Sequence, residues 1–176
     1  MFKIFFMSFI IMFNVSANEN LYQFEISSTS GKTLKLEQFK DKTLLLTNIA
    51  TRCGYTDQLD EFEKLYQKYQ KKGLMIIGIP SNDFAGQTPE GDKEVAKFCR
   101  LKYGVSFPLT TKVKVIGKDK HPLIKWMTKQ AGGDEIKWNF EKFLFNKDGK
   151  LIQRFSSATR PLSDDMLKKI EKSLSL

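Results

Sequence analysis

A continuous apolar segment that runs into a cysteine constrains the fold of this chain more than any other feature. Residues 43–49 predict a buried strand, and Cys53, one of only two cysteines, follows it after three residues. Apolar residues then recur at helical spacing over 57–72, and a second apolar strand is predicted over 74–79. Two buried strands joined by a helix form a right-handed βαβ unit with parallel strands.

This placement favours a reactive thiol at Cys53. The residue lies between the carboxyl end of a buried strand and a helix N-terminus, whose free N–H groups and positive dipole end favour an anion. The neighbouring Arg52 adds positive charge, and a thiolate is the nucleophilic form of cysteine. The alternative is a small buried filler, because free cysteine is among the most buried residue types. The βαβ segment alone leaves both readings open.

The remaining elements extend the βαβ unit into one α/β domain. Residues 22–26 and 33–36 predict an N-terminal β-hairpin. Further elements are predicted as a helix from Thr88-Pro89 to Tyr103, a strand over 112–116, a helix over 122–130, strands over 142–146 and 150–156, and a last helix after Ser163. This order resembles the thioredoxin fold, a central mixed sheet flanked by helices. In that fold the active site lies where the first strand of the βαβ unit meets its helix, which is where Cys53 falls.

The first residues predict a separate targeting segment. Lys3 precedes an apolar run over residues 4–13, and Val15-Ser16-Ala17 is a small-residue pattern of the kind that signal peptidase cleaves. We therefore expect a secretory signal peptide over 1–17, a mature domain over 18–176, and export, in a bacterium to the periplasm. An uncleaved membrane anchor is the alternative, although the run is short for a membrane span.

The positive charge of the chain indicates a solvated surface. Without residues 1–17 the chain has 28 basic and 20 acidic side chains, a net charge of +8. The lysines are scattered over helix faces and turns, and the sequence has no nucleic-acid-binding motif, so we expect no nucleic-acid partner. At most, we expect weak contact with anionic lipid headgroups.

Two further blocks narrow the function. Residues 79–87, Ile-Pro-Ser-Asn-Asp-Phe-Ala-Gly-Gln, follow the second apolar strand. Residues 136–143, Ile-Lys-Trp-Asn-Phe-Glu-Lys-Phe, lead into a later strand. Together with the segment around Cys53, they resemble the cysteine-containing branch of the glutathione peroxidase family. The resemblance covers nearly the whole chain after residue 20, with the blocks in the family's order.

The resemblance implies a peroxidase whose nucleophile is Cys53. In this chemistry a thiolate attacks the O–O bond of a peroxide and becomes a sulfenic acid, which a second thiol resolves. The family places a glutamine, a tryptophan and an asparagine around the sulfur. Trp138 and Asn139 match the last two, and we assign the glutamine position to Asp83, a departure from the family. An ionised Asp83 would repel a thiolate, whereas a protonated one could donate a hydrogen bond.

Cys99 resembles the resolving cysteine of the thioredoxin-dependent members of the family. The resemblance implies a Cys53–Cys99 disulfide that closes in each turnover and requires local unwinding of the predicted helix around Cys99. A permanent structural disulfide is the alternative, because secreted proteins often pair their cysteines.

The same resemblance sets expectations for partners and cofactors. The segment 112–133 is short compared with the tetrameric animal enzymes, which implies a monomer with an open site for organic and lipid hydroperoxides. We expect a thioredoxin-type protein as reductant in preference to glutathione, and a role in oxidative stress defence. The sequence has no metal or cofactor motif, and the single histidine, His121, is interpreted as a capping or surface residue.

Two other functions remain open from the sequence. One is a redox sensor or relay that passes its oxidised state to a partner protein. The other is a non-catalytic thioredoxin-fold module in which the two cysteines form a structural disulfide.

Overall fold

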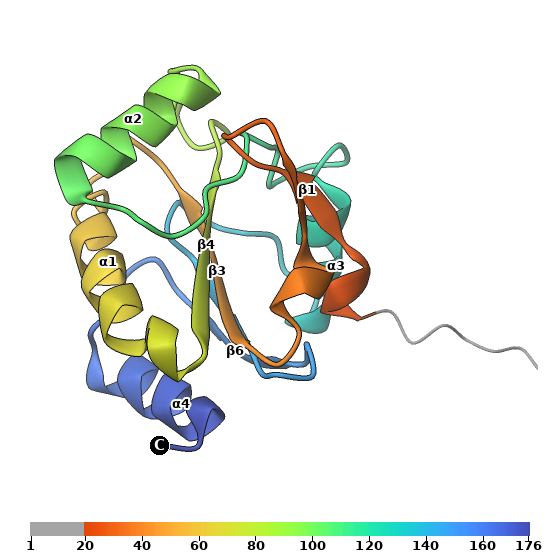
Figure 1. Ribbon diagram of the computed structural model, residues 1–176. Coiled ribbons are helices and arrows are strands. Elements are labelled where there is room, and N and C mark those ends of the chain that lie inside the picture. The colour runs from red at the N-terminus through yellow and green to blue at the C-terminus, as the bar shows by residue number, and fades with distance from the viewer. Residues whose placement is uncertain (1–19) are drawn as a thin grey trace, which may run out of the picture.

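A four-stranded mixed sheet forms the centre of the molecule (Figure 1), with the strand order β4-β3-β5-β6. The computed structural model describes residues 20–176, so the predicted signal peptide and its cleavage site lie outside the described residues. The strands are β3 (Thr43–Ile49), β4 (Leu74–Pro80), β5 (Lys142–Phe145) and β6 (Leu151–Phe155). β3 and β4 are parallel, whereas β5 is antiparallel to both β3 and β6.

The predicted βαβ unit is confirmed. α1 (Gln58–Tyr69) and the short 3-10 helix η3 (Gln70–Lys72) connect β3 to β4, whose register pairs Thr43 with Leu74 and Ile49 with Pro80. Gly73 ends this connection with φ +105°, a conformation that favours glycine. All seven residues of β3 are buried, the polar Thr47 and Asn48 included, as expected for a strand that is covered on both faces.

Helices cover both faces of the sheet (Figure 1). α1, α2 (Asp92–Tyr103) and α4 (Asp164–Leu174) pack on one face, while α3 (Pro122–Gln130) and the hairpin of β1 (Glu25–Ser27) and β2 (Thr33–Lys35) cover the other. The 3-10 helices η1 (Leu21–Gln23) and η2 (Leu36–Phe39) flank the hairpin.

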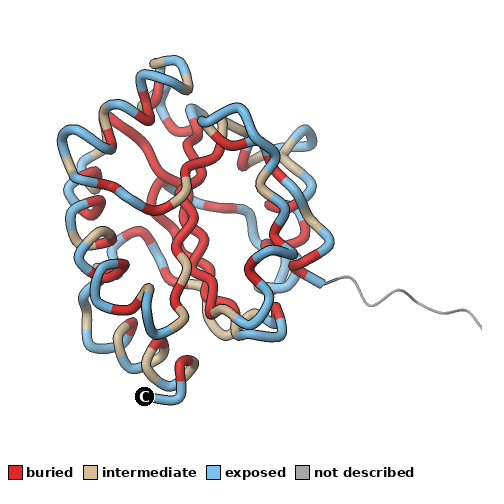
Figure 2. The backbone as a smooth tube through the Cα atoms, in the orientation of Figure 1, coloured by how far each residue is buried: buried red, intermediate tan, exposed pale blue. Residues whose placement is uncertain are grey.

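Successive side chains of β3 point to opposite faces of the sheet, as in any β-strand. Leu45 packs in the cluster that contains Phe62 of α1, whereas Leu44 and Leu46 pack in the cluster that contains Trp126 of α3. Figure 2 shows the buried residues concentrated along the strands between these layers. The predicted α/β architecture, a thioredoxin-like fold with an N-terminal hairpin, is confirmed.

Two predicted elements differ in the structure. α2 begins at Asp92 and not at Thr88-Pro89. The carbonyls of Thr88 and Glu90 accept hydrogen bonds from the Nζ atom of Lys112, at 3.0 and 2.6 Å. Because a side chain from another segment binds these carbonyls, residues 88–91 form a loop that leads into the helix.

The second difference is the segment 112–116, which contains no strand. Its Val113 N–H donates to the Pro80 carbonyl at 3.1 Å, while the N–H groups of Val115 and Ile116 bind a side chain instead of a neighbouring strand. Just before this segment, the described residues form two isolated bridges, one between Gly78 and Leu109 and one between Ser28 and Thr110.

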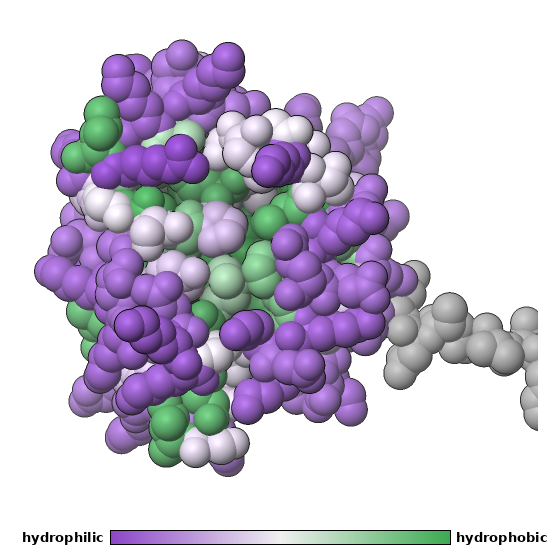
Figure 3. All heavy atoms as spheres, in the orientation of Figure 1, coloured by the Kyte–Doolittle hydropathy of each residue, from purple (hydrophilic) through white to green (hydrophobic). Residues whose placement is uncertain are grey.

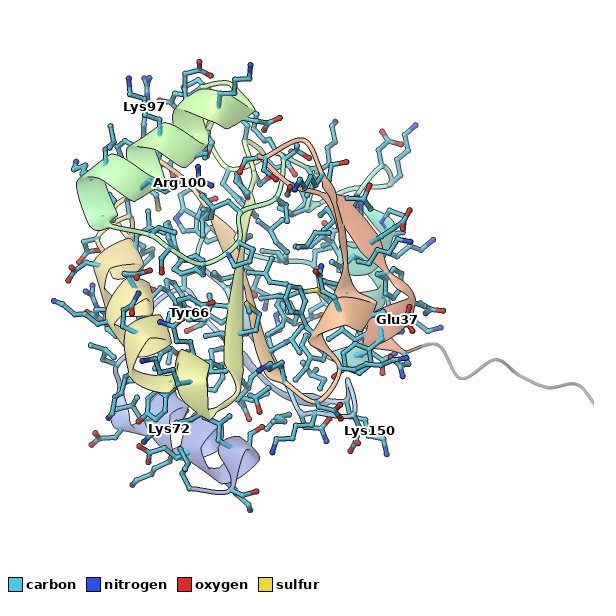
Figure 4. All side chains as sticks on the ribbon, viewed as in Figure 1. Glu37, Tyr66, Lys72, Lys97, Arg100 and Lys150 are labelled. Carbon is cyan, nitrogen blue, oxygen red and sulfur yellow. The ribbon has the colours of Figure 1, made fainter. Side chains whose placement is uncertain are left out.

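The described surface is largely hydrophilic on the face seen in Figure 3. Lys97 and Arg100 project from α2, and Lys72 lies at the far end of the α1 connection (Figure 4). None of the helices within residues 20–176 is long and apolar enough to cross a membrane.

Candidate active site

Three loops meet at the carboxyl ends of β3 and β4. The first follows β3 and contains Cys53, the second follows β4 over residues 81–91, and the third, over 134–141, precedes β5. The Arg52 N–H donates to the Gln87 carbonyl at 3.0 Å, which joins the first two loops. Asn48 joins the third loop to β3, because its Nδ2 donates to the Trp138 carbonyl at 3.1 Å.

Cys53 lies half-buried in a turn just before α1. The Tyr55 N–H points at its Sγ, with N and S 3.5 Å apart. Thr56 fixes the turn, because its Oγ1 accepts from the Cys53 N–H at 3.0 Å and donates to the Ala50 carbonyl at 3.0 Å. The predicted position of Cys53, after a buried strand and before a helix, is therefore confirmed.

Arg52 does not offer a free positive charge to the thiol. Its Nε and Nη2 atoms each lie 2.7 Å from Oε1 of Glu90, whose Oε2 accepts from the Thr51 hydroxyl at 2.6 Å. Desolvation by itself would raise the pKa of Glu90. The hydrogen bonds from Thr51 and Arg52 outweigh this effect and hold the pKa below its ordinary value. The arginine that the sequence assigned to thiolate stabilisation is thus paired with a carboxylate.

Asp83 does not take the place that the sequence assigned to it. One carboxylate oxygen, Oδ2, accepts from the N–H groups of Val115 and Ile116, at 2.6 and 3.3 Å. The prediction that Asp83 stands at the family's glutamine position is wrong, because its carboxylate binds the 112–116 segment. These two bonds also explain why that segment forms no strand.

Gln87, to which the sequence analysis assigns no role, contacts the third loop instead. Its Oε1 accepts from Nδ2 of Asn139 at 2.9 Å, and its own carbonyl binds the N–H next to Cys53. Because Oε1 is engaged, Nε2 is the free donor of this amide, and it has no acceptor within residues 20–176. A signal was present in the sequence: Gln87 closes the block over residues 79–87 and is its only glutamine.

Trp138 and Asn139 lie side by side with contrasting environments. Trp138 is 38% exposed, and its ring tilts against that of Phe84 with the centroids 5.4 Å apart. Asn139 is fully buried, and its Oδ1 atom has no hydrogen-bond partner in the described part of the chain. The next residue, Phe140, has φ +66°, an unfavourable conformation for a non-glycine residue. This turn directs Asn139 back toward Gln87.

Cys99 lies fully buried on α2, and both cysteines are free thiols in the structure. Desolvation by burial raises the pKa of the Cys99 thiol to about 12. This sulfur is therefore neutral and inaccessible while α2 is folded. The structural disulfide that the sequence left open is absent from this state.

The sequence profile of the glutathione peroxidase family matches residues 21–128. Glutathione peroxidase-like peroxiredoxin 2 of Saccharomyces cerevisiae is 43% identical over 150 residues, which cover 83% of this chain and 93% of the yeast protein. The chain belongs to the glutathione peroxidase family. It is therefore an oxidoreductase of the peroxidase class, and the family implies a peroxide substrate and a thiol reductant.

Other family members agree with this assignment. A hydroperoxy fatty acid reductase of Synechocystis is 38% identical over 167 residues, which cover 90% of this chain and 98% of that protein. The crystal structure of Trgpx in its apo form superposes with a TM-score of 0.73 at 32% identity, over 91% of this chain and 98% of that one.

His121 has the capping role predicted for it. Its Nδ1 accepts from the Leu123 N–H at 3.2 Å at the start of α3, and desolvation by burial lowers its pKa. Within residues 20–176, no group of three or more His, Cys, Asp or Glu side chains could hold a metal ion.

Proposed function

We propose that this protein is an exported thiol peroxidase in which Cys53 attacks the peroxide, Gln87 and Trp138 donate hydrogen bonds to the reacting atoms, and Asn139 orients Gln87. The observation that carries the proposal is the 2.9 Å bond from Asn139 Nδ2 to Gln87 Oε1, in the loop that binds the backbone next to Cys53. This bond leaves Gln87 Nε2 as a donor, which is the group that thiolate attack requires.

The first step oxidises Cys53. Its thiolate forms a bond to one peroxide oxygen while the O–O bond breaks, giving a sulfenic acid and a hydroxide or alkoxide that takes up a proton. Negative charge moves from sulfur to the leaving oxygen. Donors held in place before the reaction, such as Gln87 Nε2 and the Trp138 indole N–H, stabilise that charge without reorganising.

The second step uses Cys99. Its thiolate attacks the sulfenic sulfur of Cys53, which forms a disulfide and releases hydroxide, protonated to water. Burial of Cys99 and its raised pKa mean that α2 must first unwind near this residue. The C-terminal end of α2 is followed by Gly104 in the left-handed conformation, and the exposed Arg100 and Leu101 lie in the last turn of this helix.

The exposure of the site supports the proposed substrates, and the proposed disulfide supports the choice of reductant. Trp138 is 38% exposed, which supports access for organic and lipid hydroperoxides as well as hydrogen peroxide. The Synechocystis relative is named for reduction of hydroperoxy fatty acids, and the yeast relative is named a peroxiredoxin. We favour a thioredoxin-type protein over glutathione, because a Cys53–Cys99 disulfide is a substrate that a dithiol protein reduces directly.

Export to the periplasm, a monomeric state, weak contact with lipid surfaces and a role in oxidative stress defence complete the proposal. They rest on the apolar segment over residues 4–13 and on the sequence resemblance.

Stopped-flow oxidation of the reduced protein tests the proposal, with hydrogen peroxide and a fatty acid hydroperoxide in parallel. We expect rapid oxidation of the wild type, turnover with a thioredoxin system, and no peroxide consumption by Cys53→Ser. Full activity of Cys53→Ser would overturn the assignment of the nucleophile. Fast single oxidation with negligible turnover would favour the redox sensor or relay over the enzyme.

A further inference from the structure

One largely buried ion pair binds the outer side of the loop that carries Trp138 and Asn139. Arg154 on β6 and Glu141 next to β5 are 16% and 6% exposed at their side chains, and Arg154 Nη2 lies 2.7 Å from Glu141 Oε2. Arg154 Nε donates to the same oxygen at 2.7 Å. The two-point geometry fixes the orientation of the guanidinium plane.

The rest of the guanidinium binds the loop backbone. Arg154 Nη1 donates to the Asp134 carbonyl at 2.7 Å, and Nη2 donates to the Glu135 carbonyl at 2.6 Å. The second carboxylate oxygen of Glu141 accepts from the Lys137 N–H at 2.6 Å. Thus three backbone groups, immediately before Trp138 in the chain, are bound by this one pair of side chains.

The inner side of the loop is held by Asn48 on β3. Its side chain donates to the Trp138 carbonyl and accepts from the Glu141 N–H at 3.0 Å, and its carbonyl accepts from the Phe140 N–H at 2.7 Å. Between the two anchors lies the turn at Phe140, with φ +66°. A residue in that conformation persists only where surrounding contacts fix it.

Packing supports the outer side of the loop only at Ile136, which is buried in the core cluster that contains Trp126, whereas its neighbours in 134–137 are exposed. A hollow of about 270 Å³ borders Arg154 and Glu141 and is also lined by Asp134 and Lys137. If the guanidinium were removed, the 134–137 backbone would have open space into which to shift. The hydrogen bonds of Arg154, together with the packing of Ile136, therefore determine where this part of the loop lies.

We propose that Arg154, acting through Glu141 and the 134–137 backbone, is the residue that positions Trp138 and Asn139 for the reaction at Cys53. The inference rests on the proposed function of the site, and it assigns Arg154 a positioning role without contact to the substrate. Since Asn139 in turn orients Gln87, a displaced loop also misplaces the Gln87 donor.

The test compares Arg154→Met, Arg154→Lys and Glu141→Gln, each in a Trp126→Phe background that leaves Trp138 as the only tryptophan. Arg160→Met is the matched control, because Arg160 is likewise paired with carboxylates, those of Asp57 and Glu61, but forms no hydrogen bond or ion pair with residues 134–141. The measurements are the second-order rate of Cys53 oxidation by hydrogen peroxide, the rate of alkylation by an uncharged haloacetamide, acrylamide quenching of Trp138, and the melting temperature.

We expect Arg154→Met to slow oxidation by about 100-fold, the cost of displacing a reacting group by about 1 Å. Alkylation, which does not need Trp138 or Gln87, is expected to stay within about threefold of the wild type, and quenching of Trp138 to increase. Arg154→Lys, which keeps the charge but not the two-point geometry, is expected to fall between Arg154→Met and the wild type. Glu141→Gln is expected to change oxidation, alkylation and quenching in the same way as Arg154→Met.

Two results would overturn the proposal. One is oxidation of Arg154→Met at the wild-type rate with unchanged quenching. The other is an equal loss of oxidation rate in Arg160→Met at the same melting temperature, which would make Arg154 a general stabilising residue. If Arg154→Met does not fold, the oxidation rates and Trp138 quenching of Arg154→Lys and Glu141→Gln test the proposal by the same criteria. A wild type that does not react with peroxide would refute the proposed function, while quenching of Trp138 would still test the positioning of the loop.

Discussion

Gln87 and Asp83 lie four residues apart in one loop, yet their side chains bind different parts of the chain. Asp83 accepts from the backbone of the 112–116 segment, 32 residues away at Val115, and Gln87 accepts from Asn139, 52 residues away. The aspartate therefore organises the loop, and the glutamine completes the site. This division of roles leads to a direct prediction.

We predict that Gln87→Ala slows oxidation of Cys53 by hydrogen peroxide by about 100-fold, because loss of one preorganised donor has that order of effect. Asp83→Asn is the matched variant. It keeps an oxygen for the Val115 N–H and is expected to stay within about threefold of the wild type. Stopped-flow fluorescence measures both rates. The opposite pattern, with Asp83→Asn impaired and Gln87→Ala unaffected, would return the catalytic role to Asp83.

At the scale of elements, α2 combines two requirements that oppose each other. Cys99 is buried in the core cluster that contains Val95 and Phe107 when the helix is folded, and it must reach Cys53 for a disulfide to form. A hydrogen bond to a distant segment fixes the N-terminal end of α2, since Asp92 Oδ1 accepts from the Lys112 N–H at 2.7 Å. We therefore expect opening to begin at the C-terminal turn, next to Gly104.

We predict that Cys99→Ser reacts once with peroxide at nearly the wild-type rate but is not recycled by thioredoxin. Of the two cysteines, only Cys53 takes part in the attack on the peroxide, whereas recycling needs the disulfide. The Cys53 sulfenic acid should accumulate, react with a dimedone-type reagent, and over-oxidise under excess peroxide, all measurable by intact mass. Full thioredoxin-dependent turnover of this variant would show that Cys99 is not the resolving thiol.

At the scale of the whole molecule, a buried lysine joins the sheet to the loop after β6. Lys142 on β5 is fully buried, and its Nζ donates to the carbonyls of Ser156, Ser157 and Thr159 at 3.3, 3.2 and 2.6 Å. Desolvation by burial, with a smaller contribution from Arg160, lowers the pKa of Lys142 from 10.5 to about 7.

We predict that this lysine makes the free energy of unfolding rise with pH between 7 and 9. Because its pKa is lower in the folded protein, the unfolded chain binds a proton over this range that the folded protein has released, so unfolding becomes less favourable as pH rises. The contribution of this group is about 2 kcal/mol from pH 7 to pH 9. Urea unfolding at several pH values measures it. Lys142→Met should lose this pH dependence, whereas Lys147→Met, at an exposed turn, should keep it.

The mature N-terminus is also a property of the whole chain. We predict that protein recovered from the cell envelope begins at Asn18, because Val15-Ser16-Ala17 fits a signal-peptidase site. Intact-mass analysis decides this. A mass that still includes residues 1–17 would support a membrane anchor instead.

The sequence by itself determined the βαβ unit, the place of Cys53 between strand and helix, and the order of the three blocks that form the site. These features are local, because a buried parallel strand, a helical period and a turn glycine such as Gly73 are each encoded within a few neighbouring residues. The helix over 122–130 and the hairpin of β5 and β6 were predicted for the same reason.

Only the tertiary structure decided which loop side chains meet. Nothing local distinguishes Asp83 from Gln87 as the partner of Asn139, because each choice depends on hydrogen bonds to residues tens of positions away. The late start of α2 depends likewise on Lys112, and the turn at Phe140 is held by Asn48 and the Arg154–Glu141 pair. Strained turns and side-chain orientations in loops are fixed by contacts between distant segments, so they are determined once the sheet has brought those segments together.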